Sequence, residues 1–311
     1  MGVMSRLRQD QLDVLHAGSL EILERSGVRF LDPDAVALFE RAGCRVDDRV
    51  LVHIPPQRVE WALKTAPKEL VLWDQQGRDA LHLTGRKAYF GDGSDLLYIV
   101  DHRNGKRRKA VLADVEEMAR VIEALPDMDF IMSGFLPSDV PSSQLQRRQM
   151  MAMIEHSTKP IVYVTTDLPN TRCCVKMAEV AAGGEAALRR RPFAANYINI
   201  SNPLRHNPES IRKLRWLSER NLPFVYRPSI VTRGISTPVT WAGFLAVNNV
   251  ASLAGLVLSQ LVREGAPFIR CGCSGGTFDM RTMIGLHAAP EVRGFNEDMA
   301  ENVSSQKTMG K

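Results

Sequence analysis

From residue 114 onward, apolar strand-like segments alternate with helical segments, and this alternation restricts the fold more than any other feature of the chain. The strand-like segments cover residues 130–136, 161–165, 194–200, 224–230 and 267–271. Strands that alternate with helices in this way form a parallel sheet covered by helices. The sequence therefore predicts an α/β fold, either a (β/α)8 barrel or an open doubly wound sheet. Because no GxGxxG motif follows any of these strands, a dinucleotide-binding sheet is disfavoured.

The residues before this alternation are predicted to form a separate α+β layer. Helical patterns and short strand-like runs share the first hundred residues, and Asn104-Gly105 marks a β-hairpin turn. A closed barrel needs eight strands and ~250 residues, whereas about 180 residues and five predicted strands follow Asp129. We therefore predict an N-terminal α+β cap layer over residues 1–113, a partial barrel over 114–300 and an aperiodic tail over 301–311.

One uncharged segment, Trp241–Val262, is long enough at 22 residues to cross a membrane. It contains two asparagines, two serines and a glutamine, whose polar groups lipid would leave without partners. Thr240 is a suitable N-cap, and Arg263 and Glu264 follow the last apolar residue. We therefore predict a helix buried inside a large soluble domain, with no membrane partner.

The positive charge of the chain is dispersed. The net charge is +5, the tight basic clusters are residues 106–109 and 189–191, and aromatic residues make up only 6%. A nucleic-acid surface needs basic residues on one face, interleaved with aromatic residues. We therefore expect solvated turns and helix ends at these clusters, no nucleic-acid partner, and a charge that favours an acidic protein partner.

The cysteines and the N-terminus indicate a reducing compartment. The five cysteines form no CxxC pair and no zinc-binding spacing, so we expect neither a disulfide scaffold nor a metal site. The first ten residues are charged and lack the apolar core of a signal peptide. We therefore expect a cytoplasmic protein.

Ligands of a parallel α/β sheet bind at the carboxyl ends of its strands. In this sequence these ends are polar and mostly uncharged, and the candidate residues are Phe135, Tyr163, Tyr197, Asn199, Ser201, Tyr226, Arg227 and Arg270. The set contains no histidine pair, no carboxylate pair and no metal-ligand cluster, so it locates a pocket and leaves the catalytic residues unknown. Residues 272–276 fit the G-x-S-x-G pattern of hydrolases, but no acid and histidine follow at a usable spacing, so we predict a glycine-rich loop there.

Short motifs spread over residues 12–299 together resemble the trimethylamine methyltransferase family, the corrinoid-dependent methylamine and glycine betaine methyltransferases. Their order and spacing are specific; they include Ile54-Pro55-Pro56, Thr158-Lys159-Pro160, Ser201-Asn202-Pro203-Leu204, Thr237-Pro238-Val239-Thr240 and Pro290-Glu291. The resemblance implies a (β/α)8 TIM-type barrel preceded by the cap layer. It also implies that the barrel is C-terminally incomplete here, because the match fades after Met299.

The resemblance further implies the reaction, in which a methyl group moves from an amine nitrogen to the cobalt of a separate corrinoid protein. The expected partners are therefore that corrinoid protein and a small methylated amine. No cofactor is expected to bind tightly, because the corrinoid is carried by the partner and performs the difficult chemistry. We also expect a homo-oligomer.

The leaving group decides the substrate class that the resemblance implies. A quaternary amine such as glycine betaine releases a neutral tertiary amine, whereas neutral trimethylamine would release an amide anion unless it is activated first. Family members that act on trimethylamine use pyrrolysine, and this sequence contains none. We therefore favour a quaternary amine over trimethylamine.

A quaternary ammonium is recognised by aromatic faces, and Phe135, Tyr163, Tyr197 and Tyr226 are the candidates, with Arg227 or Arg270 available for a betaine carboxylate. Each aromatic could equally fill the core. Two other functions remain open, a truncated non-catalytic family remnant and a corrinoid-independent barrel lyase. No lysine at a strand end supports Schiff-base chemistry in the lyase.

Overall fold

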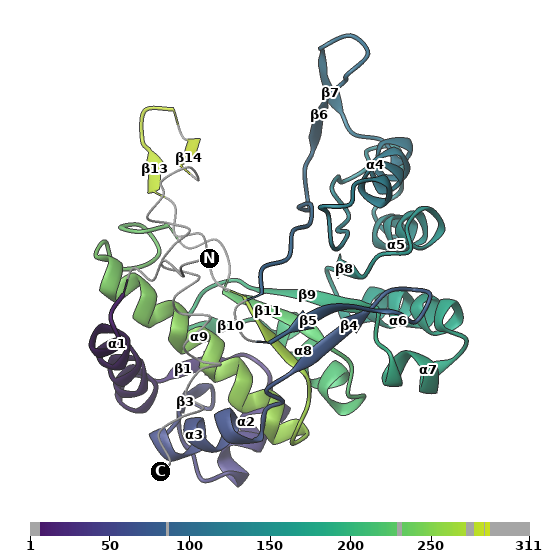
Figure 1. The fold of residues 1–311 in the computed structure, drawn as a ribbon. Helices are drawn as coiled ribbons and strands as arrows, with labels where there is room; N and C mark the ends of the chain where they lie inside the picture. The colour runs from purple at the N-terminus through teal and green to yellow at the C-terminus, as the bar shows by residue number, and fades with distance from the viewer. Residues whose placement is uncertain (1–6, 85–86, 229–231, 272–276, 283, 287–311) are drawn as a thin grey trace. The chain divides into compact units, whose positions relative to one another are not determined.

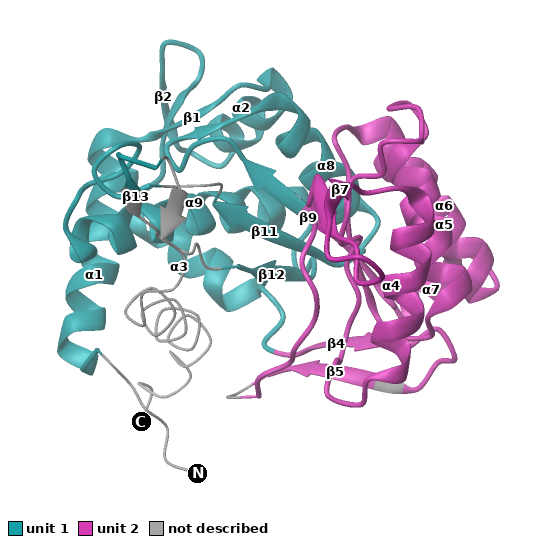
Figure 2. Cartoon of the chain, turned by 90° about the horizontal axis from the view of Figure 1, so that it is seen from above, with its two compact units in different colours: residues 1–68, 198–311 teal, residues 69–197 magenta. Residues whose placement is uncertain are grey.

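The computed structural model describes residues 7–84, 87–228, 232–271, 277–282 and 284–286. The chain divides into two compact units (Figure 2), the first formed by residues 1–68 and 198–311 and the second by residues 69–197. The predicted boundary after residue 113 lies inside the second unit. The predicted tail over 301–311 lies outside the described residues.

The N-terminal part of the first unit combines short helices with a small sheet (Figure 1). Its elements are α1 (Gln9–Glu21), the π-helix η1 (Ile22–Ser26), β1 (Val28–Phe30), α2 (Pro33–Arg41), β2 (Arg45–Asp47), β3 (Leu51–His53) and α3 (Pro56–Thr65). β3 pairs antiparallel with both β1 and β2. β1 also pairs in parallel with β10 (Arg205–His206), so a strand from the C-terminal half completes this sheet.

The C-terminal part of the first unit contains a parallel strand pair and the longest helix. Its elements are α8 (Pro208–Glu219), β11 (Phe224–Pro228), α9 (Trp241–Val262), β12 (Phe268–Arg270), β13 (Thr277–Asp279) and β14 (Ile284–Leu286). β11 and β12 pair in parallel, with Tyr226 opposite Arg270. The strands predicted over 224–230 and 267–271 are therefore confirmed as β11 and β12, while residues 229–230 of the first prediction lie outside the described residues.

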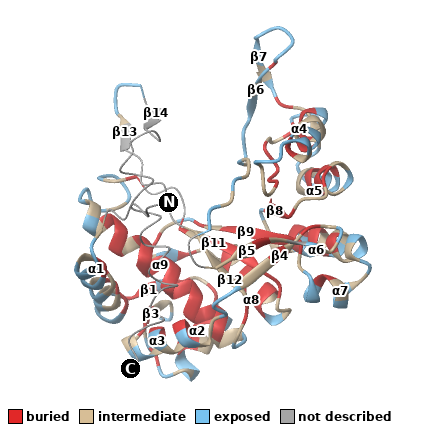
Figure 3. Cartoon of the chain, viewed as in Figure 1, coloured by how far each residue is buried: buried red, intermediate tan, exposed pale blue. Residues whose placement is uncertain are grey.

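Helix α9 is the core of the first unit and begins and ends at the predicted residues. Thr240 caps it by accepting a hydrogen bond from the Gly243 amide at 3.3 Å. Most of the helix is buried (Figure 3), and α1, α2, α3 and α8 pack against it. It is the one described helix that is long and apolar enough to cross a membrane, and 83% of its most apolar window is buried inside the protein.

Several polar groups of α9 have partners inside the protein, whereas Ser252 Oγ and the Oδ1 atoms of Asn248 and Asn249 are buried without a hydrogen-bond partner among the described residues. The Asn249 amide donates to the Ser19 hydroxyl of α1 at 3.0 Å, and that hydroxyl lies 2.7 Å from the Leu15 carbonyl. Ser259 and Ser218 of α8 share a hydrogen bond of 3.0 Å. These contacts satisfy groups whose burial without a partner would cost free energy, and they confirm a helix built for a protein interior.

The second unit consists of two hairpins and a layer of helices beside a parallel strand pair. Its elements are β4 (Leu70–Trp73), β5 (Asp79–Leu83), β6 (Tyr98–Val100), β7 (Arg107–Lys109), α4 (Leu112–Ala124), α5 (Leu145–His156), β8 (Ile161–Val164), α6 (Leu168–Ala182) and α7 (Glu185–Arg190). Strand β9 (Ala194–Ile200) begins in this unit and ends in the first. β8 pairs in parallel with β9, as the sequence predicts, and β6 and β7 form the hairpin predicted at Asn104-Gly105.

The segment predicted as a strand over residues 130–136 forms only isolated bridges, to Gly91, Leu96 and Ile161. Its backbone groups form hydrogen bonds with several separate segments and not with one neighbouring strand. The Met132 amide donates to the Asp92 side chain, and the Gly134 amide donates to the Gly93 carbonyl. The fold is thus a mixed α/β structure with parallel strands and helices, and the C-terminally incomplete TIM-type barrel stays a prediction.

Candidate functional site

Strands β11 and β12 present different residues on their two faces. Side chains alternate along a strand, so Tyr226 and Arg270, which are opposite one another, project from one face, and Arg227 projects from the other. The Tyr226 face is the one covered by α9, since a Cβ added at Gly255 would lie 2.3 Å from the Tyr226 ring. Arg227 therefore projects from the face opposite α9.

Of the two helix-facing residues, Tyr226 is buried and Arg270 is half-buried. Tyr226 is fully buried, and its hydroxyl lies 2.7 Å from Nδ1 of the buried His206. Burial raises the pKa of Tyr226 and lowers that of His206 to about 3, so both are neutral. Burial also lowers the pKa of Arg270 to about 10, which leaves it protonated at neutral pH. The substrate contact predicted for Tyr226 and Arg270 stays a prediction, and the proposal below does not use it.

The side chains of β8 and β9 also alternate between a face covered by a helix and the opposite face. The buried Asn196 donates to the Thr165 hydroxyl at 3.1 Å, which in turn lies 2.6 Å from the Thr171 hydroxyl of α6. This is the face covered by α6, and Tyr163, opposite Asn196 and 3% exposed, lies on it. Tyr197 and Asn199 therefore project from the opposite face of β9, and both are half-buried.

The remaining predicted residues lie at or after strand ends. Ser201 follows β9 and is exposed, and Phe135 is half-buried in the bridged segment after residue 130. The G-x-S-x-G segment lies outside the described residues. Within the described ranges, no group of three or more His, Cys, Asp or Glu side chains could hold a metal ion.

A carboxyl group that the sequence analysis missed, that of Asp92, lies beside Met132 and Gly134. Asp92 accepts a hydrogen bond from the Met132 amide at 2.5 Å through Oδ1, while its buried Oδ2 has no hydrogen-bond partner among the described residues. The buried hydroxyl of Ser133 also has none there. Burial raises the pKa of Asp92 to about 7, so this carboxyl changes charge near neutral pH. Its one sequence signal is an aspartate flanked by two glycines, Gly91 and Gly93.

The raised pKa of Asp92 predicts a pH-dependent stability. A carboxyl with a pKa of about 7 when folded and 3.8 when unfolded favours folding while protonated, and this contribution is lost as pH rises through 7. Because Asp92 is partly exposed, we expect a loss of roughly 2 kcal/mol between pH 5 and pH 8, compared with Asp92→Asn. Urea unfolding of both proteins at the two pH values measures this difference. Parallel pH profiles for the two proteins would show that Asp92 does not titrate in this range.

Comparison with known proteins identifies the family. A family model described as Trimethylamine methyltransferase (MTTB) matches residues 1–294. The chain belongs to the trimethylamine methyltransferase family. The resemblance inferred from the motifs of this chain is therefore confirmed over nearly the whole sequence.

Individual relatives include proteins named for two substrates. Trimethylamine methyltransferase MttB of Desulfitobacterium hafniense (strain DSM 10664 / DCB-2) is 28% identical over 293 residues, which cover 94% of this chain and 59% of the relative. Glycine betaine methyltransferase of strain Y51 of that species is also 28% identical, over 93% of this chain and 60% of the relative. Trimethylamine methyltransferase MttB of Methanosarcina barkeri (strain Fusaro / DSM 804) is 26% identical, over 91% and 58%. The chain thus spans about 59% of the length of these relatives, and family membership supports methyl transfer without choosing the amine.

Proposed function

We propose that this chain is a methyltransferase that moves a methyl group from a quaternary amine, such as glycine betaine, to the cobalt of a corrinoid protein. The observation that carries the proposal is the family match over residues 1–294, with a glycine betaine methyltransferase among the relatives. The methyl acceptor is a second substrate, carried by a separate protein, and it supplies the nucleophile. The chain itself then needs no tightly bound cofactor.

Methyl transfer from a quaternary amine requires no acid–base catalysis by the protein at the nitrogen atom. When the methyl–nitrogen bond breaks, the bonding pair stays on nitrogen and a neutral tertiary amine leaves, so no proton has to be supplied. The protein then contributes by orienting the methyl group and excluding water from the reacting atoms. Half-buried polar and aromatic side chains such as Tyr197 and Asn199 suit this work.

Two residues that project away from the helix-covered faces match the charges of glycine betaine. The Arg227 guanidinium can bind a carboxylate through two parallel hydrogen bonds. The Tyr197 ring offers a face to a quaternary ammonium, a contact worth ~0.5–2 kcal/mol depending on how far it is desolvated. We assign Arg227 to the carboxylate, and Tyr197 and Asn199 of β9 stay predicted substrate contacts.

The overall charge suits the second substrate. A net charge of +5 favours association with an acidic carrier protein through long-range attraction. We propose that the complex forms in the cytoplasm, where the reduced cysteines of this chain are stable.

A methyl-transfer assay tests this function. We expect methylcobalt absorbance to appear when this chain is mixed with glycine betaine and a cobalt(I) corrinoid, and to be absent with trimethylamine. Activity with trimethylamine but with no quaternary amine would refute the substrate class. A folded chain that is inactive with every methylated amine would favour the non-catalytic remnant or the lyase.

A further inference from the structure

The β6–β7 hairpin of the second unit projects beyond α4 as a two-stranded sheet with both outer edges unpaired among the described residues (Figure 1). Large apolar side chains are exposed along its first strand and just before it. Leu97 is 59% exposed, Tyr98 44% and Val100 64%. Two-stranded hairpins are marginally stable alone in water, and unpaired edges are open to another strand.

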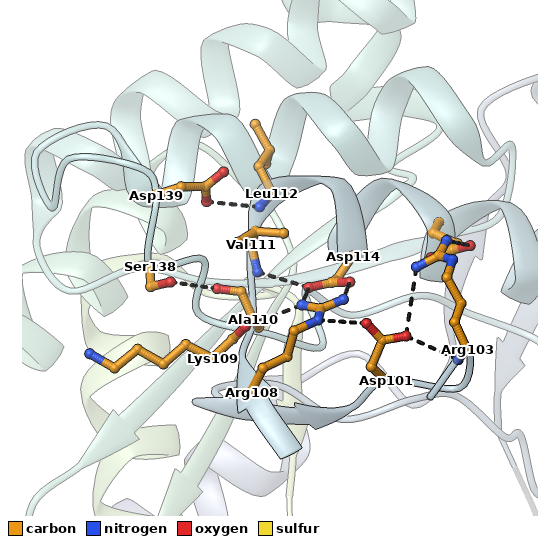
Figure 4. A network of polar contacts seen from close by, with 11 residues as sticks. Asp101, Arg103, Arg108, Lys109, Ala110, Val111, Leu112, Asp114, Ser138 and Asp139 are labelled. Carbon is orange, nitrogen blue, oxygen red and sulfur yellow. Dashed lines mark hydrogen bonds and ion pairs between the residues drawn. The ribbon is translucent and has the colours of Figure 1, made fainter. Parts of the chain in front are cut away.

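The base of this hairpin is nevertheless firmly held (Figure 4). The Arg108 guanidinium donates two hydrogen bonds of 2.7 Å to Asp114 at the start of α4, and a third of 3.0 Å to Asp101. Asp114 also accepts from the Val111 amide at 2.8 Å, and arginine pairing lowers the pKa of both aspartates. Asp114 is buried and Arg108 is half-buried, and their two-fold hydrogen bonding fixes the hairpin on α4 and presents its strands in one orientation.

The two edges of the hairpin differ in their protection. The Asp101 amide donates to the Lys106 carbonyl and the Ala110 amide to the Leu97 carbonyl, so every second residue of each strand turns its backbone groups outward. On β7 those residues are Arg107 and Lys109, and charged side chains of this kind block edge-to-edge pairing. On β6 they are Tyr98 and Val100, which carry no charge. Of the two edges, only that of β7 is therefore protected by charged side chains against pairing with another strand.

We infer that two copies of this chain pair through the β6 edge, antiparallel about a two-fold axis at Ile99. In this register Tyr98 of each copy exchanges two backbone hydrogen bonds with Val100 of the other, giving four in all. An aromatic and a β-branched side chain then lie opposite each other in both pairs, which is a favourable cross-strand combination. The edge is self-complementary, as a two-fold interface requires.

Charge is compatible with a second copy as the occupant. In the four-stranded sheet the two β7 strands lie outermost, three strand spacings or ~14 Å apart. This exceeds the Debye length of ~8 Å at physiological ionic strength, so their basic side chains repel only weakly. The Arg107 guanidinium, moreover, already lies over the Tyr98 ring at 4.0 Å.

A lipid surface fits this hairpin less well. The apolar side chains lie along the strand and at its base, whereas the tip, residues 102–106, is polar and charged. Insertion of the tip into a bilayer would bury those charges, while a neighbouring strand beside β6 leaves them in water.

Sedimentation velocity of the full chain at increasing concentration tests the pairing. We expect a reversible monomer–dimer equilibrium whose dissociation constant rises at least about tenfold in Val100→Lys, because the two introduced lysines lie diagonally, ~7–8 Å apart. The matched control is Val180→Lys on α6, where the valine is 73% exposed, and it should dimerise like the unsubstituted chain. Far-ultraviolet circular dichroism establishes that each variant is folded.

A cysteine variant tests the register. Ile99→Cys places two thiols opposite each other in a non-hydrogen-bonded pair, ~4.5 Å apart between Cα atoms, which is within reach of a disulfide. Mild oxidation should crosslink this variant into a dimer and leave the unsubstituted chain uncrosslinked. A chain that is monomeric at every concentration, a Val100→Lys variant that dimerises like Val180→Lys, or an uncrosslinked Ile99→Cys variant would each overturn the proposal. Binding of anionic vesicles by a monomeric chain would assign the hairpin to a membrane instead.

Discussion

Replacing Arg227 by glutamine is expected to weaken the binding of glycine betaine about 100-fold, because a charge-assisted pair with a carboxylate in a half-buried site contributes about 3 kcal/mol. Binding of tetramethylammonium, which has no carboxylate, should stay unchanged. Isothermal titration with both ligands measures the two affinities on the same protein preparation.

The matched control for this experiment is Arg270→Gln. Arg270 lies on the strand next to Arg227, on the face covered by α9, so its replacement should leave the affinity for glycine betaine within a few-fold of the original. Equal losses in the two variants, or a loss confined to Arg270→Gln, would contradict the assignment of Arg227. A thermal melt of each variant verifies that the affinities are compared between folded proteins.

Replacing Gly255 by alanine is expected to destabilise the first unit by about 3 kcal/mol. The added Cβ would lie 2.3, 2.6 and 2.9 Å from three atoms of the Tyr226 ring, so the ring must move. That movement strains a packed core and breaks the hydrogen bond between the Tyr226 hydroxyl and the buried His206. The better helix propensity of alanine offsets about 1 kcal/mol of this loss.

Gly18→Ala on α1 is the control, because Gly18 is also helical but a Cβ there meets nothing within 4 Å. It should leave stability unchanged or raise it by up to about 1 kcal/mol. Chemical denaturation of both variants gives the difference. If Gly255→Ala were as stable as Gly18→Ala, the close packing of Tyr226 on α9 would be wrong, and with it the assignment of faces on β11.

Local patterns in the sequence predict the parallel strands and the core helix well. The apolar runs that became β8, β9, β11 and β12 are short and bounded by polar turns, and α9 has an N-cap threonine and charged residues at its end. Such signals are local, so they do not depend on what the segment packs against.

Which side chains of a strand face the covering helix depends on packing partners, so it could not be predicted from the sequence. Tyr226 and Arg227 are consecutive at the end of one strand, and a rule based on strand ends selects both. Only the contact between Tyr226 and Gly255 of α9 decides which side chain faces the helix. The same is true of Tyr163, whose burial is fixed by α6 and by Asn196 on the neighbouring strand.

Contacts between distant segments were also beyond the sequence analysis. The parallel pairing of Arg29 with Arg205 joins residues far apart in the chain, and no local pattern marks the two-residue strand β10. This pairing and the packing of α1 and α3 on α9 join the first 68 residues to the C-terminal half, where the sequence suggested a separate layer ending at residue 113. Asp92 was missed for a similar reason, because its burial depends on the segment around Met132.

The most direct test of the proposed function follows the methyl carbon itself. Glycine betaine carrying ¹³C in its N-methyl groups is incubated with this chain and a cobalt(I) corrinoid, and the products are examined by nuclear magnetic resonance. The proposal predicts a labelled methyl–cobalt signal and one equivalent of labelled dimethylglycine, both dependent on the protein and diminished in Arg227→Gln. Labelled glycine betaine that remains intact, while labelled trimethylamine transfers its methyl group to cobalt under the same conditions, would contradict it.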